Sequence, residues 1–114
     1  MANLPNETIT TVLNLERRLL QLINEATAAG YIILEQFGET QETIPEIDEL
    51  QNVRERATSY YIRLYRLLLQ ISESQPVASS AKLNLLAQSA AQTQAISDAG
   101  EASTQEIKRN WNLP

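Results

Sequence analysis

The chain has 114 residues and a net charge of −5, and 43% of its residues are hydrophobic but only 5% are aromatic. This size and composition predict one globular, all-α domain, because an aliphatic core suits closely packed helices better than stacked sheets. The sequence contains no cysteine and no histidine, which excludes disulfides, thiolate metal sites, the usual nitrogen ligand of metals and the commonest general base.

The first predicted helix covers about residues 6–37. Asn6 is a suitable N-cap, and Glu7 lies in the first turn, where a carboxylate favours the helix dipole. The main apolar row recurs at alternating intervals of three and four, the pattern of a heptad seam, and consists of Val12, Leu15, Leu19, Leu22, Ala26, Ala29 and Ile33. Further apolar side chains lie beside this row, so the helix needs more than one neighbour.

The second predicted helix covers about residues 44–72 and begins with a capping box. Thr43 is expected to be the N-cap, and Glu46 is expected to bond back to it three positions later. A second heptad row consists of Leu50, Val53, Ala57, Tyr60, Leu64, Leu67 and Ile71. This helix therefore presents an apolar seam of the same kind as the first.

The two apolar rows match in antiparallel order without a slip. Leu19 falls opposite Leu64, and Ala26 falls opposite Ala57. Small residues near this midpoint, including Gly30, favour close packing of the two helices over a ligand pocket, since no convergent polar side chains accompany them. The sequence therefore predicts a long antiparallel helical hairpin.

The third predicted helix covers about residues 76–111, and Ser74 or Ser79 is expected to cap it. Its apolar face is marked by Leu83, Leu86, Ala90, Thr93 and Ile96. From Ser97 to Gln105 there is almost no large apolar side chain, and a glycine such as Gly100 costs about 1 kcal/mol in a helix interior. We therefore expect a thin, frayed or broken helix near Gly100.

These elements predict an up-down-up antiparallel three-helix bundle that forms a single domain over residues 1–114. The third helix is too poor in large apolar groups to cover both stripes of the hairpin, so we expect a homodimer or another helical protein to cover the rest. The candidate partner-binding residues lie beside the two seams and are Leu13, Leu20, Ile23, Leu34, Tyr61, Tyr65 and Leu68. For the tyrosines, packing beside the seam is favoured over stacking on nucleic-acid bases.

Charged residues are distributed unevenly along the hairpin. Between residues 19 and 53 every charged residue is acidic, whereas arginines gather toward the opposite end. The candidate basic patch consists of Arg17, Arg18, Arg63 and Arg66. A nucleic-acid-associated accessory protein would use this patch, but the net negative charge argues against nucleic acid as a partner.

No residue set carries a catalytic, cofactor-binding or metal-binding pattern. The three glycines, at 30, 38 and 100, cannot form a phosphate-binding loop or a dinucleotide fingerprint, so no enzyme activity and no cofactor are expected. No apolar run approaches the roughly 20 residues that span a bilayer, and no signal-peptide pattern is visible, so we expect a cytoplasmic protein. The leading interpretation is a non-enzymatic adaptor or regulatory subunit that binds helical proteins, and the alternative is the nucleic-acid accessory protein.

Overall fold

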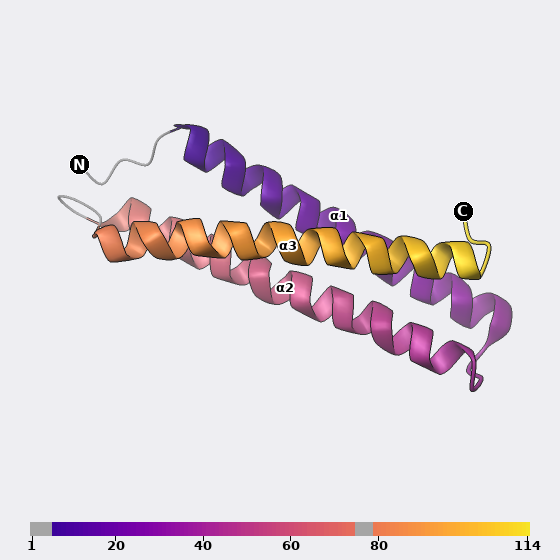
Figure 1. Ribbon diagram of the computed structural model, residues 1–114. Helices are drawn as coiled ribbons and strands as arrows, with labels where there is room; N and C mark the ends of the chain where they lie inside the picture. Colours follow the sequence, from indigo (N-terminus) through magenta and orange to yellow (C-terminus); the bar gives the residue numbers. More distant parts are fainter. Residues whose placement is uncertain (1–5, 75–78) are drawn as a thin grey trace.

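The computed structural model describes residues 6–74 and 79–114 and shows three long helices packed together (Figure 1). They are α1 (Asn6–Phe37), α2 (Thr43–Glu73) and α3 (Ser80–Asn110). Within the described ranges no strand is present, so the predicted all-helical, three-helix structure is confirmed. Successive helices run in alternating directions along a rod of 57 × 19 × 18 Å.

The core follows the two heptad rows of the hairpin. Leu19 and Leu64, which the spacing assigns to one layer, are both fully buried. The other buried members of the two rows are Val12, Leu22, Ala26, Ala29, Ile33, Leu50, Val53, Ala57 and Ile71. Leu15, Tyr60 and Leu67 are half-buried and pack against this core. Every seam residue predicted from the spacing therefore contributes to the core.

Helix α2 is capped one turn earlier than the sequence predicts. The Thr40 hydroxyl accepts hydrogen bonds from the backbone N–H groups of Glu42 at 3.2 Å and Thr43 at 3.0 Å. Thr43 Oγ1 in turn accepts from the N–H of Thr40 at 2.8 Å and donates to the carbonyl of Gly38 at 2.7 Å. Thr43 thus lies three positions after Thr40 in a reciprocal cap that starts at Thr40, and its predicted role as an N-cap paired with Glu46 is wrong.

Glu46 instead helps to close one end of the bundle. Its Oε2 accepts a hydrogen bond from Nε1 of Trp111 at 2.9 Å. The Trp111 ring also meets the Phe37 ring edge to face, with 4.9 Å between the ring centroids. The chain after α3 is therefore tied to both the end of α1 and the start of α2.

Helix α3 runs without a break through Gly100, so the expected weak point does not interrupt it. Its buried face consists of Leu86, Ser89, Thr93, Ser97, Gly100, Thr104 and Ile107, which recur at intervals of three and four. A Cβ on Gly100 would lie only 2.7 Å from Cδ2 of Leu22 and 3.2 Å from Cγ1 of Val53. The missing side chain therefore lets α3 approach the hairpin closely, and burial offsets the low helix propensity of glycine.

The start of α3 differs in part from the prediction. Ser79 caps the helix, because its hydroxyl accepts from the N–H of Lys82 at 3.2 Å, whereas Ser74 ends α2. The predicted start near Pro76 lies outside the described residues, and the helix begins at Ser80. Of the predicted apolar face, Leu86 and Thr93 are buried and Ala90 and Ile96 are half-buried, but Leu83 is 40% exposed.

Candidate functional site

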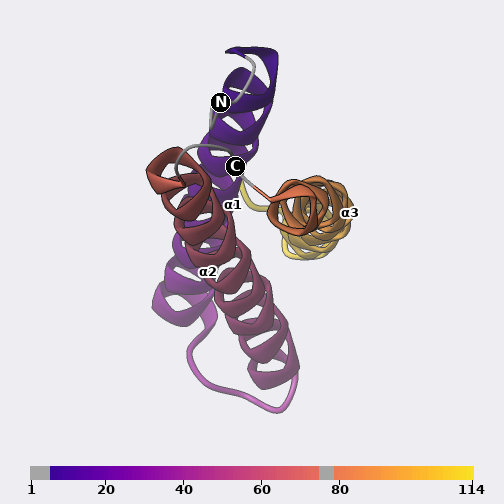
Figure 2. The same cartoon turned by 90° about the vertical axis from the view of Figure 1, so that its left-hand side faces the viewer.

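Polar contacts show which side of the hairpin α3 covers. On α1, Arg18 donates through Nε to Oε2 of Glu101 at 2.7 Å and through Nη2 to Oε1 at 2.8 Å, and it also pairs with Asp98. On α2, Arg63 donates to Oε1 of Gln92 at 3.2 Å. Figure 2 shows α3 on one side of the α1–α2 hairpin, so the opposite side is left uncovered.

We call this uncovered side the open face; two further heptad rows form it. The row on α1 is Leu13, Glu16, Leu20, Ile23, Thr27, Gly30 and Leu34, and the row on α2 is Ile47, Gln51, Arg54, Thr58, Tyr61, Tyr65 and Leu68. The two rows are neighbours, because Thr27 and Leu34 line the same groove as Ile47 and Arg54. All seven residues predicted to bind a partner belong to the open face, so the structure brings these residues together on one surface.

One half of the open face carries large, exposed side chains. Leu13 is 55% exposed, Leu20 52% and Tyr65 51%. Tyr61 and Leu68 are half-buried beside them and pack against the core. We call these five residues the ridge. They lie in the half of the hairpin that is remote from the α1–α2 turn.

The other half of the open face, toward the α1–α2 turn, is hollowed. A groove of about 240 Å³ is lined by Ala26, Thr27, Gly30, Tyr31, Leu34, Ile47, Leu50, Gln51 and Arg54. Ala26 and Leu50 are buried and form its floor, whereas Tyr31 and Leu34 are exposed and form its wall on α1. The small size of Gly30 keeps this groove open.

Glu16 is a buried carboxylate within the open face. It is only 7% exposed, and this burial raises its pKa, while a side-chain hydrogen bond from Tyr61 acts in the opposite direction. The burial of Glu16 was not predicted from the sequence. The signal was present, since Glu16 continues the heptad spacing of Leu13 and Leu20.

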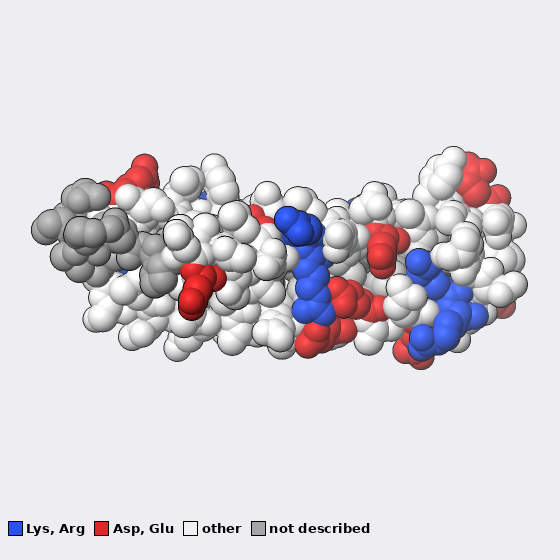
Figure 3. Space-filling view, turned by 90° about the horizontal axis from the view of Figure 1, so that it is seen from above, with Lys and Arg blue, Asp and Glu red and all other residues white. Residues whose placement is uncertain are grey.

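The four arginines of the predicted basic patch do not form one cluster: Arg63 and Arg66 line the same hollow on α2, whereas Arg17 and Arg18 lie on α1. Arg18 and Arg63 turn toward α3, and the hydrogen bonds of Arg18, to Glu101 above all, hold its pKa above the ordinary value. Arg17 and Arg66 are exposed, and their helical phase places them at the two outer edges of the open face. In the view of Figure 3 basic side chains lie beside acidic ones and do not form a continuous basic surface.

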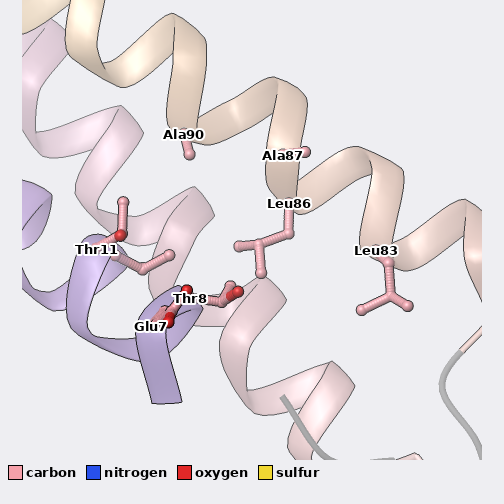
Figure 4. Close-up of a pocket in the computed structure, with 8 residues that line it drawn as sticks. Glu7, Thr8, Thr11, Leu83, Leu86, Ala87 and Ala90 are labelled. Carbon is pink, nitrogen blue, oxygen red and sulfur yellow. The ribbon is translucent and has the colours of Figure 1, made fainter. Parts of the chain in front are cut away.

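A second groove lies between the first turns of α1 and the first turns of α3, where the two helices diverge (Figures 1 and 4). It has a volume of about 420 Å³ and is lined by Glu7, Thr8, Thr11, Val12, Leu83, Leu86, Ala87 and Ala90. Its α3 wall is apolar, and the divergence explains why Leu83 is exposed. The polar groups of its α1 wall do not converge on one point (Figure 4). This groove therefore lacks the convergent polar groups of a ligand-binding site.

Within residues 6–74 and 79–114, no three or more acidic side chains gather as a metal site would require, and none of the helices is long and apolar enough to cross a membrane. Comparison of the chain with models of protein families, with curated proteins and with solved structures finds no match. The open face is the feature of the described structure that contains the seven predicted partner-binding residues.

Proposed function

We propose that this protein is a non-enzymatic protein–protein interaction module that binds a helical partner, a second copy of itself included, on the open face. The observation that carries this proposal is the exposure of Leu13, Leu20 and Tyr65 along a face that α3 leaves uncovered. Apolar area that a partner removes from water contributes about 25 cal/mol per Å². The heptad rows suit a partner helix laid along the hairpin.

The proposal includes a role as a cytoplasmic adaptor or regulatory subunit without catalysis or cofactor. It is supported by the sequence, which lacks the histidine and cysteine of most acid–base and nucleophilic sites. A nucleic-acid accessory role receives less support, because Arg18 is neutralised by α3 and the net charge is −5.

The test compares two substitutions of equally exposed leucines. Leu20 in the ridge is 52% exposed and Leu85 on α3 is 50% exposed, so Leu85→Glu is a matched control for Leu20→Glu. Wild-type and variant chains are compared by sedimentation velocity at micromolar concentration, and as tagged baits in extracts of the natural host.

We expect Leu20→Glu to lose self-association or the captured partner while its far-UV circular dichroism stays unchanged. Leu85→Glu should behave like the wild type. If the two variants bind equally well, the open face is not the binding surface.

A further inference from the structure

We infer that the open face binds a second copy of the chain with its ends reversed, so that the ridge of each copy lies in the groove of the other. This inference rests on the proposed function and specifies the partner and its orientation. Two independent properties of the open face carry it, namely its shape and the charges along its edges.

The ridge of one copy meets the groove of the other only when the ends are reversed. The ridge and the groove occupy opposite halves of the same surface, with Leu20 in the ridge and Gly30 in the groove. A twofold axis that lies in the interface, perpendicular to the helices, places α1 antiparallel on α1 of the second copy. Each ridge then faces a groove, whereas chains that run in the same direction place ridge on ridge and groove on groove.

Opposite charges lie along both edges of the open face. The outer edge of α1 carries Arg17 and Glu35, and the outer edge of α2 carries Asp48 and Arg66 together with Glu55 and Glu73. Two pairs of opposite charge matter here, Arg17 with Glu35 and Asp48 with Arg66. Within each pair the two residues are 18 positions apart in the sequence, which corresponds to five whole turns and therefore to the same side of the helix. All four side chains are exposed, and none forms an ion pair with another described residue.

These charges distinguish the two possible orientations. In the antiparallel hairpin the two arginines, Arg17 and Arg66, lie at one level, and the two acids, Glu35 and Asp48, lie at another. Chains that run in the same direction stack α1 on α2 of the second copy. This arrangement sets Arg17 on Arg66 and Glu35 on Asp48, so like charges meet. Reversed ends set Arg17 beside Glu35 of the second copy and Asp48 beside Arg66 of the second copy, so each of these pairs becomes attractive.

The position of the axis agrees between the two edges. The midpoint of Arg17 and Glu35 is Ala26, and the midpoint of Asp48 and Arg66 is Ala57. The antiparallel register of the hairpin places Ala26 opposite Ala57, and both are buried at the centre of the core. A single twofold axis at this level therefore forms all the edge pairs at once.

A charge-swap experiment tests the orientation. Arg17 and Glu35 are about 27 Å apart along α1, so they cannot pair within one chain. The dissociation constant of the dimer is measured by sedimentation equilibrium at low salt for Arg17→Glu, for Glu35→Arg and for the double variant. Because the twofold axis repeats each pair, we expect each single variant to weaken the dimer about tenfold and the double variant to restore it.

A control variant should leave the dissociation constant unchanged, and the contrary orientation would lower it for Arg17→Glu. Arg109→Glu makes the same charge change on α3 and should leave the dissociation constant unchanged, since Arg109 is exposed away from the open face. Chains that run in the same direction would instead be strengthened by Arg17→Glu, because it removes the repulsion from Arg66 of the second copy. A stronger dimer, or a double variant no better than the singles, overturns the inference.

Cross-linking separates this inference from the proposed function. The sequence has no cysteine, so Arg17→Cys and Glu35→Cys each introduce a single thiol. A short bis-maleimide should join the two variants when they are mixed but should not join either variant to itself. If Leu20→Glu dissociates the dimer but no mixed cross-link forms, the reversed orientation is wrong and the open face remains the binding surface. If the wild-type chain stays monomeric, a second copy is not the partner.

Discussion

Arg18 of α1 and Glu101 of α3 are joined by two parallel hydrogen bonds, of 2.7 and 2.8 Å, between the guanidinium and the carboxylate. Asp98 adds a further bond to the same guanidinium. All ion pairs among the described residues involve Arg18. This contact lies on the side of the hairpin that α3 covers, so it helps to decide which apolar face stays open.

The first prediction concerns the strength of this contact. The side chains of Arg18 and Glu101 are 28% and 39% exposed, so water screens their attraction. A double-mutant cycle with Arg18→Gln and Glu101→Gln should give a coupling of about 0.5–1 kcal/mol in urea unfolding, and high salt should reduce it. Arg17→Gln should show no coupling to Glu101→Gln, and a coupling of the same size there would contradict the geometry.

The second prediction compares two glycines within helices. A Cβ at Gly30 would lie 3.8 Å from Cδ1 of Leu50, an ordinary contact, so Gly30→Ala should stabilise the monomer by up to about 1 kcal/mol through helix propensity. A Cβ at Gly100 would lie 2.7 Å from buried Leu22, so Gly100→Ala should destabilise it by about 1–3 kcal/mol through overpacking. Urea unfolding midpoints that shift in the same direction would refute the close approach of α3.

The third prediction concerns the cap of α2. Thr43 is 1% exposed and its hydroxyl bonds to the backbone of Thr40 and Gly38, so Thr43→Val should cost about 1–3 kcal/mol by leaving these groups unpaired. Thr40→Ala should cost about 0.5–2 kcal/mol by removing the cap acceptor. Thermal melts check both, with helix content at low temperature nearly unchanged. A neutral Thr40→Ala would mean that Thr40 does not cap the helix.

The fourth prediction concerns buried hydroxyls on α3. Ser97 Oγ and Thr104 Oγ1 have no hydrogen-bond partner among the described residues, whereas Thr93 Oγ1 donates to the carbonyl of Ser89 at 2.7 Å. Thr104→Val and Ser97→Ala should therefore be neutral or stabilising by about 1 kcal/mol, because they remove an unpaired buried polar group. Thr93→Val is the control and should destabilise in the same urea titration. Losses of equal size at Thr93 and Thr104 would contradict this.

The fifth prediction concerns the pH dependence of stability. Burial raises the pKa of Glu16 in the folded chain, so the folded state binds its proton more tightly than the unfolded state. The stability that this proton contributes is fully present below the ordinary carboxyl pKa of about 4.3 and is lost as the pH rises through the raised value. Glu16→Gln should therefore gain stability relative to the wild type between acid and neutral pH.

Urea unfolding of dilute, monomeric protein across this pH range measures the effect. Tyr61→Phe removes the hydrogen bond that opposes the rise, so it should steepen the loss of stability toward neutral pH. If the difference between wild type and Glu16→Gln does not change with pH, the carboxylate is not desolvated.

The sequence by itself was sufficient for the hairpin. Large aliphatic residues such as Leu19 and Leu64 repeat with the helical period, so spacing alone identifies the buried side of each helix and their antiparallel order. It was not sufficient for the cap of α2, because Thr40 and Thr43 are both good capping residues. The choice between them depends on how the turn leaves Gly38, whose φ is 71°.

Only the tertiary structure decided the role of α3. Its buried face is built from residues such as Thr93, Ser97 and Gly100, which carry a weak hydropathy signal but fit closely against the hairpin. Hydropathy measures the cost of exposure to water, whereas the docking of α3 depends on the space beside Leu22 and on the reach of Arg18 to Glu101. The same packing left one of two apolar stripes uncovered, a choice that the period of the hairpin helices cannot make.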